Sequence, residues 1–262
     1  MKINAGTLSN YLTATLENAQ DHAAEAPQLM FLVDQMDEIF QREIFAHDFD
    51  APPTAALLVM NAYTMLLSAV RQALSGHVVT TYPVARAALE SACYAFLIAR
   101  DESKSDIWFD RHTSQKALKT CRQTFTAKSA ADELKLIDPV MAEYVLAYYD
   151  ASIDFGAHPN RKSVTDHLED SGAVGEGLHG FELTGVYGRN SWQVNQALLA
   201  CVEAGLAIAF LTVASSEKHP LVHERASVYQ NWMDEKNRVV SELKGGTVDG
   251  KGPIYCSVTP PQ

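Results

Sequence analysis

Apolar residues recur at helical spacing along most of the chain, every three to four positions. The clearest stretch runs from Thr54 to Ser75, where apolar side chains fill most of one helix surface: Leu57, Leu58, Met60, Tyr63, Leu66, Leu67 and Val70. Similar patterns predict helices near 7–26, 27–46, 105–121, 191–214 and 220–244, with a connector at 47–53 and two pieces inside 130–153. Another is expected from about Val84 to Arg100, opened by Pro83 after a break at 78–82. The pattern predicts an all-α fold, one helical bundle-like domain of about eight helices over residues 1–246.

Three segments depart from the amphipathic pattern. Residues 161–188 are rich in glycine and have little helical period, which predicts an irregular insertion, with a possible small hairpin from Val164–Leu168 and Phe181–Val186. Residues 247–262 follow two glycines and are expected to form an extended or disordered tail. Ala197 to Ala214 is almost wholly apolar and approaches the length of a membrane span, with Glu203 as its single charge. Because no belt of basic or aromatic residues flanks it, we expect a helix buried on all faces and no membrane insertion.

Composition adds limits on partners and location. The chain has 262 residues, of which 47% are hydrophobic, enough for a sizeable core, and its net charge is −11. That charge repels phosphate backbones, so nucleic acid is disfavoured as a partner, although RNA binding is not excluded. The four cysteines form no C-x-x-C pair and are expected to be reduced, and residues 1–20 contain no apolar secretory segment. These features favour a cytoplasmic location.

Two charged residues stand out on an otherwise apolar helix. Arg86 and Glu90 lie four positions apart, so their side chains face the same direction. On so apolar a helix they are expected to be partly buried, and a buried pair needs partners. The pair is either a structural ion pair or part of a polar site at the centre of the domain.

A second polar cluster follows the last piece of the 130–153 helical region. It contains Tyr149, Asp150, His158 and Asn160 around the break at Phe155-Gly156. A histidine in this place can act as an acid, a base or a donor near neutral pH, or it can close the helix end with a hydrogen bond. With Arg86 and Glu90, these residues are the candidate ligand-binding set.

An arginine followed by a histidine at six-residue spacing occurs twice, as Arg71–His77 and as Arg161–His167. In a nuclease such an arginine steadies phosphate charge while the histidine moves the 2′-hydroxyl proton. Both pairs are candidate catalytic residues, and loose spacing of two common residues also arises by chance. The glycine run 172–177 lacks the Lys-Ser/Thr ending of a P-loop, and no H-E-x-x-H motif is present. We therefore expect no cofactor and no metal.

The order of these motifs resembles bacterial helical proteins of unknown function that are similar to the HEPN superfamily. The likeness covers about residues 54–161 and is carried by Arg86-Ala87-Ala88-Leu89-Glu90, Ile107-Trp108-Phe109, Tyr149-Asp150-Ala151-Ser152 and His158-Pro159-Asn160. It implies a helical protein that dimerises. Many members are metal-independent RNases of toxin or antiphage systems with an R-x(4–6)-H motif, and others lack the motif and act by binding. Here positions 151–153, counted back from His158, offer no arginine, which puts catalysis through His158 in doubt.

Two function classes follow. The first is a non-catalytic binding or assembly module, expected to be a homodimer, with a polar pocket near Arg86, Glu90 and His158 and an unknown small-molecule ligand. The second is a metal-independent endoribonuclease that uses one of the Arg/His pairs.

Overall fold

A computed structural model describes residues 6–48, 50–159, 161–188, 191–216, 219–222, 224–244 and 252–258. Within these ranges the chain is mostly helical, with eleven α-helices and one two-stranded sheet. The helices are α1 Leu8–Ala24, α2 Met30–Ile39, α3 Pro53–Leu74, α4 Val78–Arg100, α5 Lys104–Phe109, α6 Gln115–Thr124, α7 Ala127–Leu134, α8 Pro139–Ser152, α9 Arg161–Thr165, α10 Trp192–Ala214 and α11 Ala226–Lys244. The prediction of an all-α fold with about eight helices is therefore correct for the helical character and wrong in its details. The region 101–137 divides into short helices whose ends are capped by Ser114 and Thr126.

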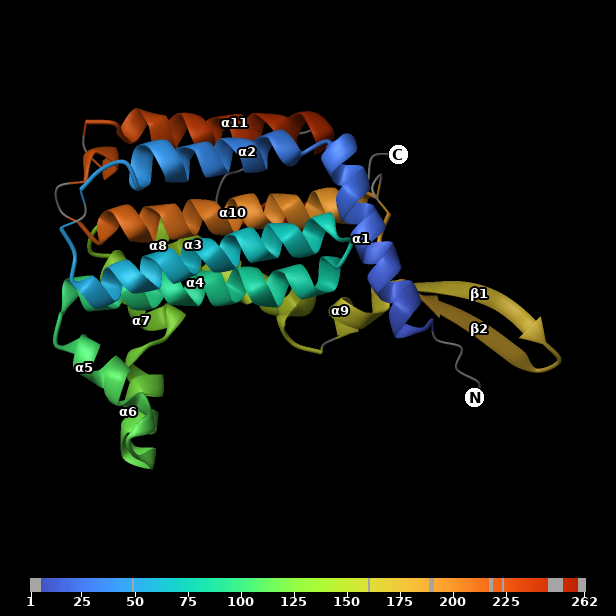
Figure 1. The fold of residues 1–262 in the computed structure, drawn as a ribbon, viewed down its shortest axis with the longest axis horizontal. Coiled ribbons are helices and arrows are strands. Elements are labelled where there is room, and N and C mark those ends of the chain that lie inside the picture. The colour runs from blue at the N-terminus through green and yellow to red at the C-terminus, as the bar shows by residue number, and fades with distance from the viewer. Residues whose placement is uncertain are drawn as a thin grey trace.

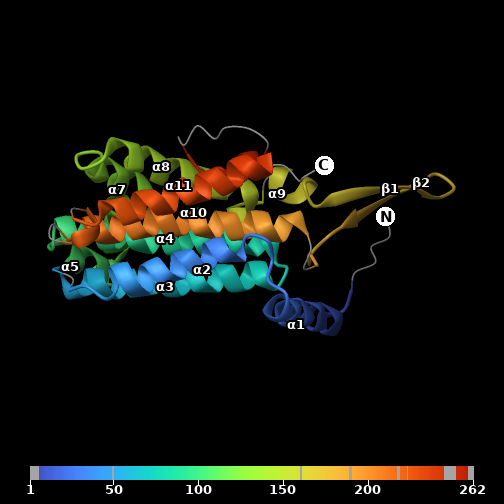
Figure 2. The ribbon, with the colours of Figure 1, turned by 90° about the horizontal axis from the view of Figure 1, so that it is seen from above.

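The core lies where α3, α4 and α10 pack against one another, as the apolar pattern predicts. Figure 1 shows α10 running between the pair α2 and α11 and the pair α3 and α4, and Figure 2 shows α7 and α8 on the side opposite α3. Among the described helices, α3 and α10 are long and apolar enough to cross a membrane. Length and composition alone are weak evidence that a helix does so. In α10, 94% of the most apolar window is buried inside the protein, against 44% in α3. We conclude that α10 is a central core helix.

Helix α4 begins earlier than its sequence indicates. The expected break at 78–82 is helical, and Pro83 lies inside the helix. Val78, Thr81 and Tyr82 are buried, so tertiary packing holds the first turns in place. The proline costs the helix one hydrogen bond, because its nitrogen has no hydrogen to donate to the carbonyl of Val79.

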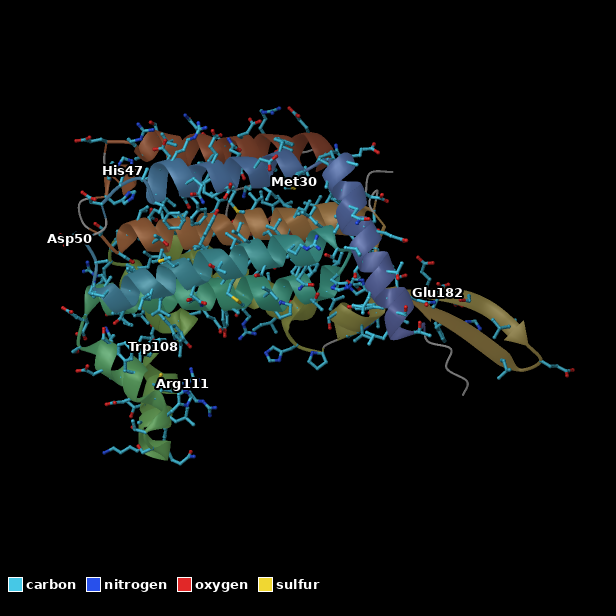
Figure 3. The ribbon with its side chains drawn as sticks, viewed as in Figure 1. Met30, His47, Asp50, Trp108, Arg111 and Glu182 are labelled. Carbon is cyan, nitrogen blue, oxygen red and sulfur yellow. The ribbon has the colours of Figure 1, made fainter. Side chains whose placement is uncertain are left out.

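The insertion at 161–188 is more regular than predicted. After α9, strands β1 Leu168–Gly175 and β2 Leu178–Leu183 pair antiparallel, with Leu168 opposite Leu183. The turn between the strands contains Gly177 at φ 73°, a conformation that glycine adopts without strain. The hairpin points away from the helices (Figure 1). The residue labelled Glu182 in Figure 3 belongs to β2. The prediction of an irregular insertion is wrong here. The small hairpin named as a possibility is present, but not with the strands Val164–Leu168 and Phe181–Val186: β1 begins at Leu168, after α9, and β2 ends at Leu183.

Part of the C-terminal tail packs on the core. Residues 252–258 contain the 3₁₀ turn Tyr255–Ser257, and the side chains of Ile254, Tyr255 and Val258 are buried. The Tyr255 ring stacks on that of Tyr82, with centroids 5.7 Å apart. An extended or disordered tail is therefore the wrong description of these seven residues, because three apolar side chains find space between the helices.

Candidate functional site

Arg86 on α4 is held by side chains from two helices. Its Nε donates to Glu90 Oε1 at 3.1 Å, one turn further along α4, and its Nη2 donates to the Tyr149 hydroxyl on α8. The guanidinium carbon lies 4.3 Å from the centroid of the Tyr149 ring, so the contact is also a cation–π contact. The side chains of Arg86 and Glu90 are 17% and 36% exposed. Of the second predicted polar cluster, Tyr149 thus meets the Arg86–Glu90 pair, at an edge of the bundle that solvent reaches.

The guanidinium of Arg86 can donate more hydrogen bonds than these two. An arginine side chain carries five N–H groups. Among the described residues, Glu90 and Tyr149 engage only two of them. The remaining donors sit beside an aromatic ring in a half-buried setting, where a hydrogen bond is stronger than in open water.

A second arginine, Arg111, acts on Tyr94, further along α4 than Glu90. The pKa of Tyr94 is raised by burial and by the negative charge of Glu90, and the positive charge of Arg111 acts against that rise. Figure 3 labels Arg111, with Trp108, on the arm that α5 and α6 form beside the bundle. The Nε of Arg111 is buried and has no hydrogen-bond partner among the described residues. Among the described residues, no hydrogen bond or ion pair joins Arg111 to Arg86 or Glu90, so Arg111 is not part of the Arg86 site.

A close backbone approach fixes α8 against α4. The π-helical turn Ile153–Ala157 follows α8, and a Cβ on Gly156 would lie 2.4 Å from the carbonyl oxygen of Val79. That carbonyl is the one that Pro83 leaves without a helical donor. The Phe155 and Tyr82 rings pack next to it, with centroids 5.5 Å apart. Glycine at 156 is thus required for the approach that keeps Tyr149 beside Arg86.

Among the described residues, no other member of the predicted ligand-binding set forms a hydrogen bond with Arg86. Asp150 is exposed on α8. His158 is exposed too, and its carbonyl accepts a hydrogen bond from Ser163 Oγ at 3.0 Å. Asn160 lies outside the described residues. That contact involves only the backbone of His158, and no hydrogen bond given for the described residues places its exposed ring at the helix end or at Arg86.

The first predicted Arg/His pair is split between two environments. Arg71 is exposed on the last turn of α3. His77 is half-buried, its Nδ1 lies 2.9 Å from Gln72 Oε1, and its ring stacks on Tyr11 with centroids 4.8 Å apart. Burial lowers the pKa of His77, which keeps the ring neutral at pH 7. No described hydrogen bond or ion pair connects Arg71 with His77.

The second pair lies at the same end of the bundle. Arg161 is exposed on α9, and His167 Nδ1 lies 2.5 Å from the Tyr187 hydroxyl. Burial lowers the pKa of His167 as well. The backbone nitrogen of Tyr187 donates to the Gly76 carbonyl at 3.0 Å, next to His77 in the chain. Tyr187 therefore connects the neighbourhoods of the two histidines, which the sequence did not indicate.

A buried ion pair was missed by the sequence reasoning. Glu203 on α10 is fully buried, and Lys236 on α11 donates to its Oε1 at 2.8 Å with only 2% of its side chain exposed. The carboxylate also accepts from the backbone nitrogens of Ile254 at 2.8 Å and Tyr255 at 2.9 Å. The single acidic residue in the apolar 197–214 run was the signal, because a buried carboxylate requires several donors.

Groups that could ligate a metal do not gather in the described part of the chain, where no three His, Cys, Asp or Glu side chains come together. The four cysteines form no disulfide bond, and Cys93, Cys121 and Cys201 are buried. Burial raises the pKa of the Cys93 and Cys201 thiols, which keeps them protonated and unreactive. This agrees with the expectation of reduced cysteines in the core.

Comparison of the chain with family models, with curated proteins and with solved structures found no match. The resemblance to HEPN proteins therefore rests on the short motifs between about residues 54 and 161 alone.

Proposed function

We propose that this chain is a non-catalytic binding and assembly module that works as a homodimer and binds a polar ligand through Arg86. The observation that carries the proposal is the half-buried guanidinium, which Glu90 and Tyr149 orient while three of its N–H groups have no partner among the described residues. An oriented arginine of this kind suits a ligand carboxylate or carbonyl oxygen. Because Glu90 already offsets its charge, a singly charged or neutral oxygen group fits better than a phosphate.

The outer face of α3 supports the homodimer. Leu57, Met60 and Leu67 are 62%, 64% and 42% exposed there. From Leu57 to Ser68 the other exposed residues of α3 are uncharged: Asn61, Thr64 and Ser68. The next exposed residue along the helix is Arg71. Two copies with a net charge of −11 each repel one another, so they associate best across a face that carries no charge. The part of the α3 face from Leu57 to Ser68 is such a face, and its small polar side chains allow two helices to approach closely.

The cytoplasm of a bacterium is the proposed location, and a relationship to HEPN proteins that act by binding is the proposed ancestry. Reduced cysteines support the location. The Arg86–Glu90 motif, joined in space to Tyr149, supports the ancestry, since these residues carry the resemblance.

Titration with acetate, followed by NMR of the arginine Nε–H resonances, tests the ligand site. Saturable shifts at Arg86 are expected, with much smaller ones at Arg238, whose guanidinium is already bonded to both Glu235 and Glu242. Equal shifts at both arginines would mean that acetate binds without a site, and the proposal would fail.

Sedimentation equilibrium tests the dimer. Met60→Glu places a charge on the α3 face and is expected to convert the dimer to a monomer. Val174→Glu is the matched control, because Val174 is exposed to a similar degree, 61%, on the hairpin. A monomeric wild type, or a dimer unaffected by Met60→Glu, refutes this interface.

A metal-independent RNase is the second candidate, favoured by one observation. Tyr187 bonds to His167 and to the backbone beside His77, so the two Arg/His segments lie at one end of the bundle. Cleavage of single-stranded RNA in EDTA, lost in His167→Ala or His77→Ala, is the result this candidate requires. The binding module requires no cleavage under the same conditions.

A further inference from the structure

A cavity of about 720 Å³ lies at the end of the bundle where α10 ends and α11 begins, at the left in Figure 1. Its wall is formed by α8, α10, α11 and the turn Pro220–Val222, and most of its side chains are apolar: Ile137, Val140, Phe210, Val213, Leu221 and Met233. Small-molecule sites typically measure roughly 300–1,000 Å³ and combine apolar walls with a few polar groups. In size and composition this cavity has the properties of such a site.

One polar group in the wall has no partner. Ser216 is only 1% exposed, and its Oγ has no hydrogen bond among the described residues. Other polar groups of the wall are satisfied within the protein. The Tyr229 hydroxyl donates to the Leu206 carbonyl at 2.7 Å, and the Asp138 carboxylate accepts from the backbone nitrogens of Val140 and Met141. A buried hydroxyl is costly to leave unpaired, but the Ser216 Oγ has almost no accessible surface, so a molecule in the cavity does not reach it and meets mainly apolar side chains.

The charge of the wall narrows the ligand class. One arginine, Arg100, and one aspartate, Asp138, line the cavity, and their formal charges cancel. A ligand with a net charge gains nothing from such a wall and loses its hydration on entry. We propose that the cavity binds an uncharged, largely apolar small molecule.

This site is separate from the one at Arg86 and does not depend on the proposed function. Arg100, at the end of α4, is fourteen positions beyond Arg86, which corresponds to roughly 21 Å along a helix. A chain with both sites would bind a polar group at one edge and an apolar molecule at the end of the bundle.

Nile red, an uncharged apolar dye with a carbonyl oxygen, is a suitable probe in a fluorescence titration of the full chain. Saturable binding with a blue-shifted emission is expected for the wild type. Ala226→Phe is the blocking variant, because Ala226 is exposed and lines the cavity, so the larger ring fills the cavity without entering the core. Its affinity should fall by about tenfold or more, as expected for an overfilled site. Ala23→Phe, at an exposed position on α1, is the matched control and should bind as the wild type does.

Unchanged binding by Ala226→Phe, or no saturable binding by the wild type, overturns the proposed site. Far-UV circular dichroism of each variant checks that the helices are intact.

Discussion

Lys236→Met should destabilise the protein strongly, because it removes the only side chain that neutralises the buried Glu203 carboxylate among the described residues. In the wild type, Lys236 Nζ lies 2.8 Å from Glu203 Oε1, and the backbone nitrogens of Ile254 and Tyr255 donate to the same carboxylate. The variant keeps the two backbone donors and leaves a full negative charge inside the core. Methionine has a similar length and fills the space of the lysine stem.

The magnitude follows from the burial of both partners. Removing one member of a buried ion pair typically costs about 3–5 kcal/mol, because the other charge is left without compensation. The side chains of Lys236 and Glu203 are 2% and 0% exposed, so water does not screen the charge that remains on Glu203. We therefore expect a loss of about 3–5 kcal/mol in the free energy of unfolding, which corresponds to about 1–2 M in the urea midpoint.

Urea unfolding followed by far-UV circular dichroism measures the effect. Lys104→Met is the matched control, because Lys104 pairs with Asp101 at 3.4 Å on the surface, and a loss of about 0–1 kcal/mol is expected there. The double variant Glu203→Gln with Lys236→Met removes both charges and keeps an oxygen for the backbone donors. It should be more stable than Lys236→Met alone. A loss below about 1 kcal/mol for Lys236→Met would refute the argument that the pair is buried and charged.

Three further outcomes are expected. Gly156→Ala should cost about 1–3 kcal/mol of unfolding free energy in a urea titration, because the new Cβ would meet the Val79 carbonyl, whereas Gly185→Ala has open space and should change little. Tyr149→Phe should cost about 0.5–1.5 kcal/mol at most in the same assay, since it removes one hydrogen bond to Arg86 at a partly exposed site, and a larger loss would contradict the geometry. Burial lowers the folded-state pKa of His77, His167 and His219 below 6.5, so the unfolded chain binds more protons as the pH falls through that value, and the unfolding free energy should decrease between about pH 7 and pH 5.5. His167→Gln should reduce this slope, and an unchanged slope would argue against a shifted pKa at His167.

The amino-acid sequence determined the helical character of the protein and its main core helices. Apolar residues at three- and four-residue steps mark α3 and α10 because a helix buries one stripe, or all of its surface, at that spacing. The sequence also placed Arg86 and Glu90 on one side of α4, since residues four apart always share a helix face. These are local properties, and local spacing was enough to predict them.

Only the tertiary structure decided which distant residues meet. Tyr149 reaches Arg86 because Gly156 lets the end of α8 approach the Val79 carbonyl on α4. The C-terminal residues Ile254 and Tyr255 are held by Glu203, about fifty positions earlier in the chain. Pairings of this kind depend on how helices and loops pack against one another. The spacing of hydrophobic residues along the chain does not specify that packing. For that reason the helices were predictable from the sequence, while the partners of the buried charges and the order of the tail were not.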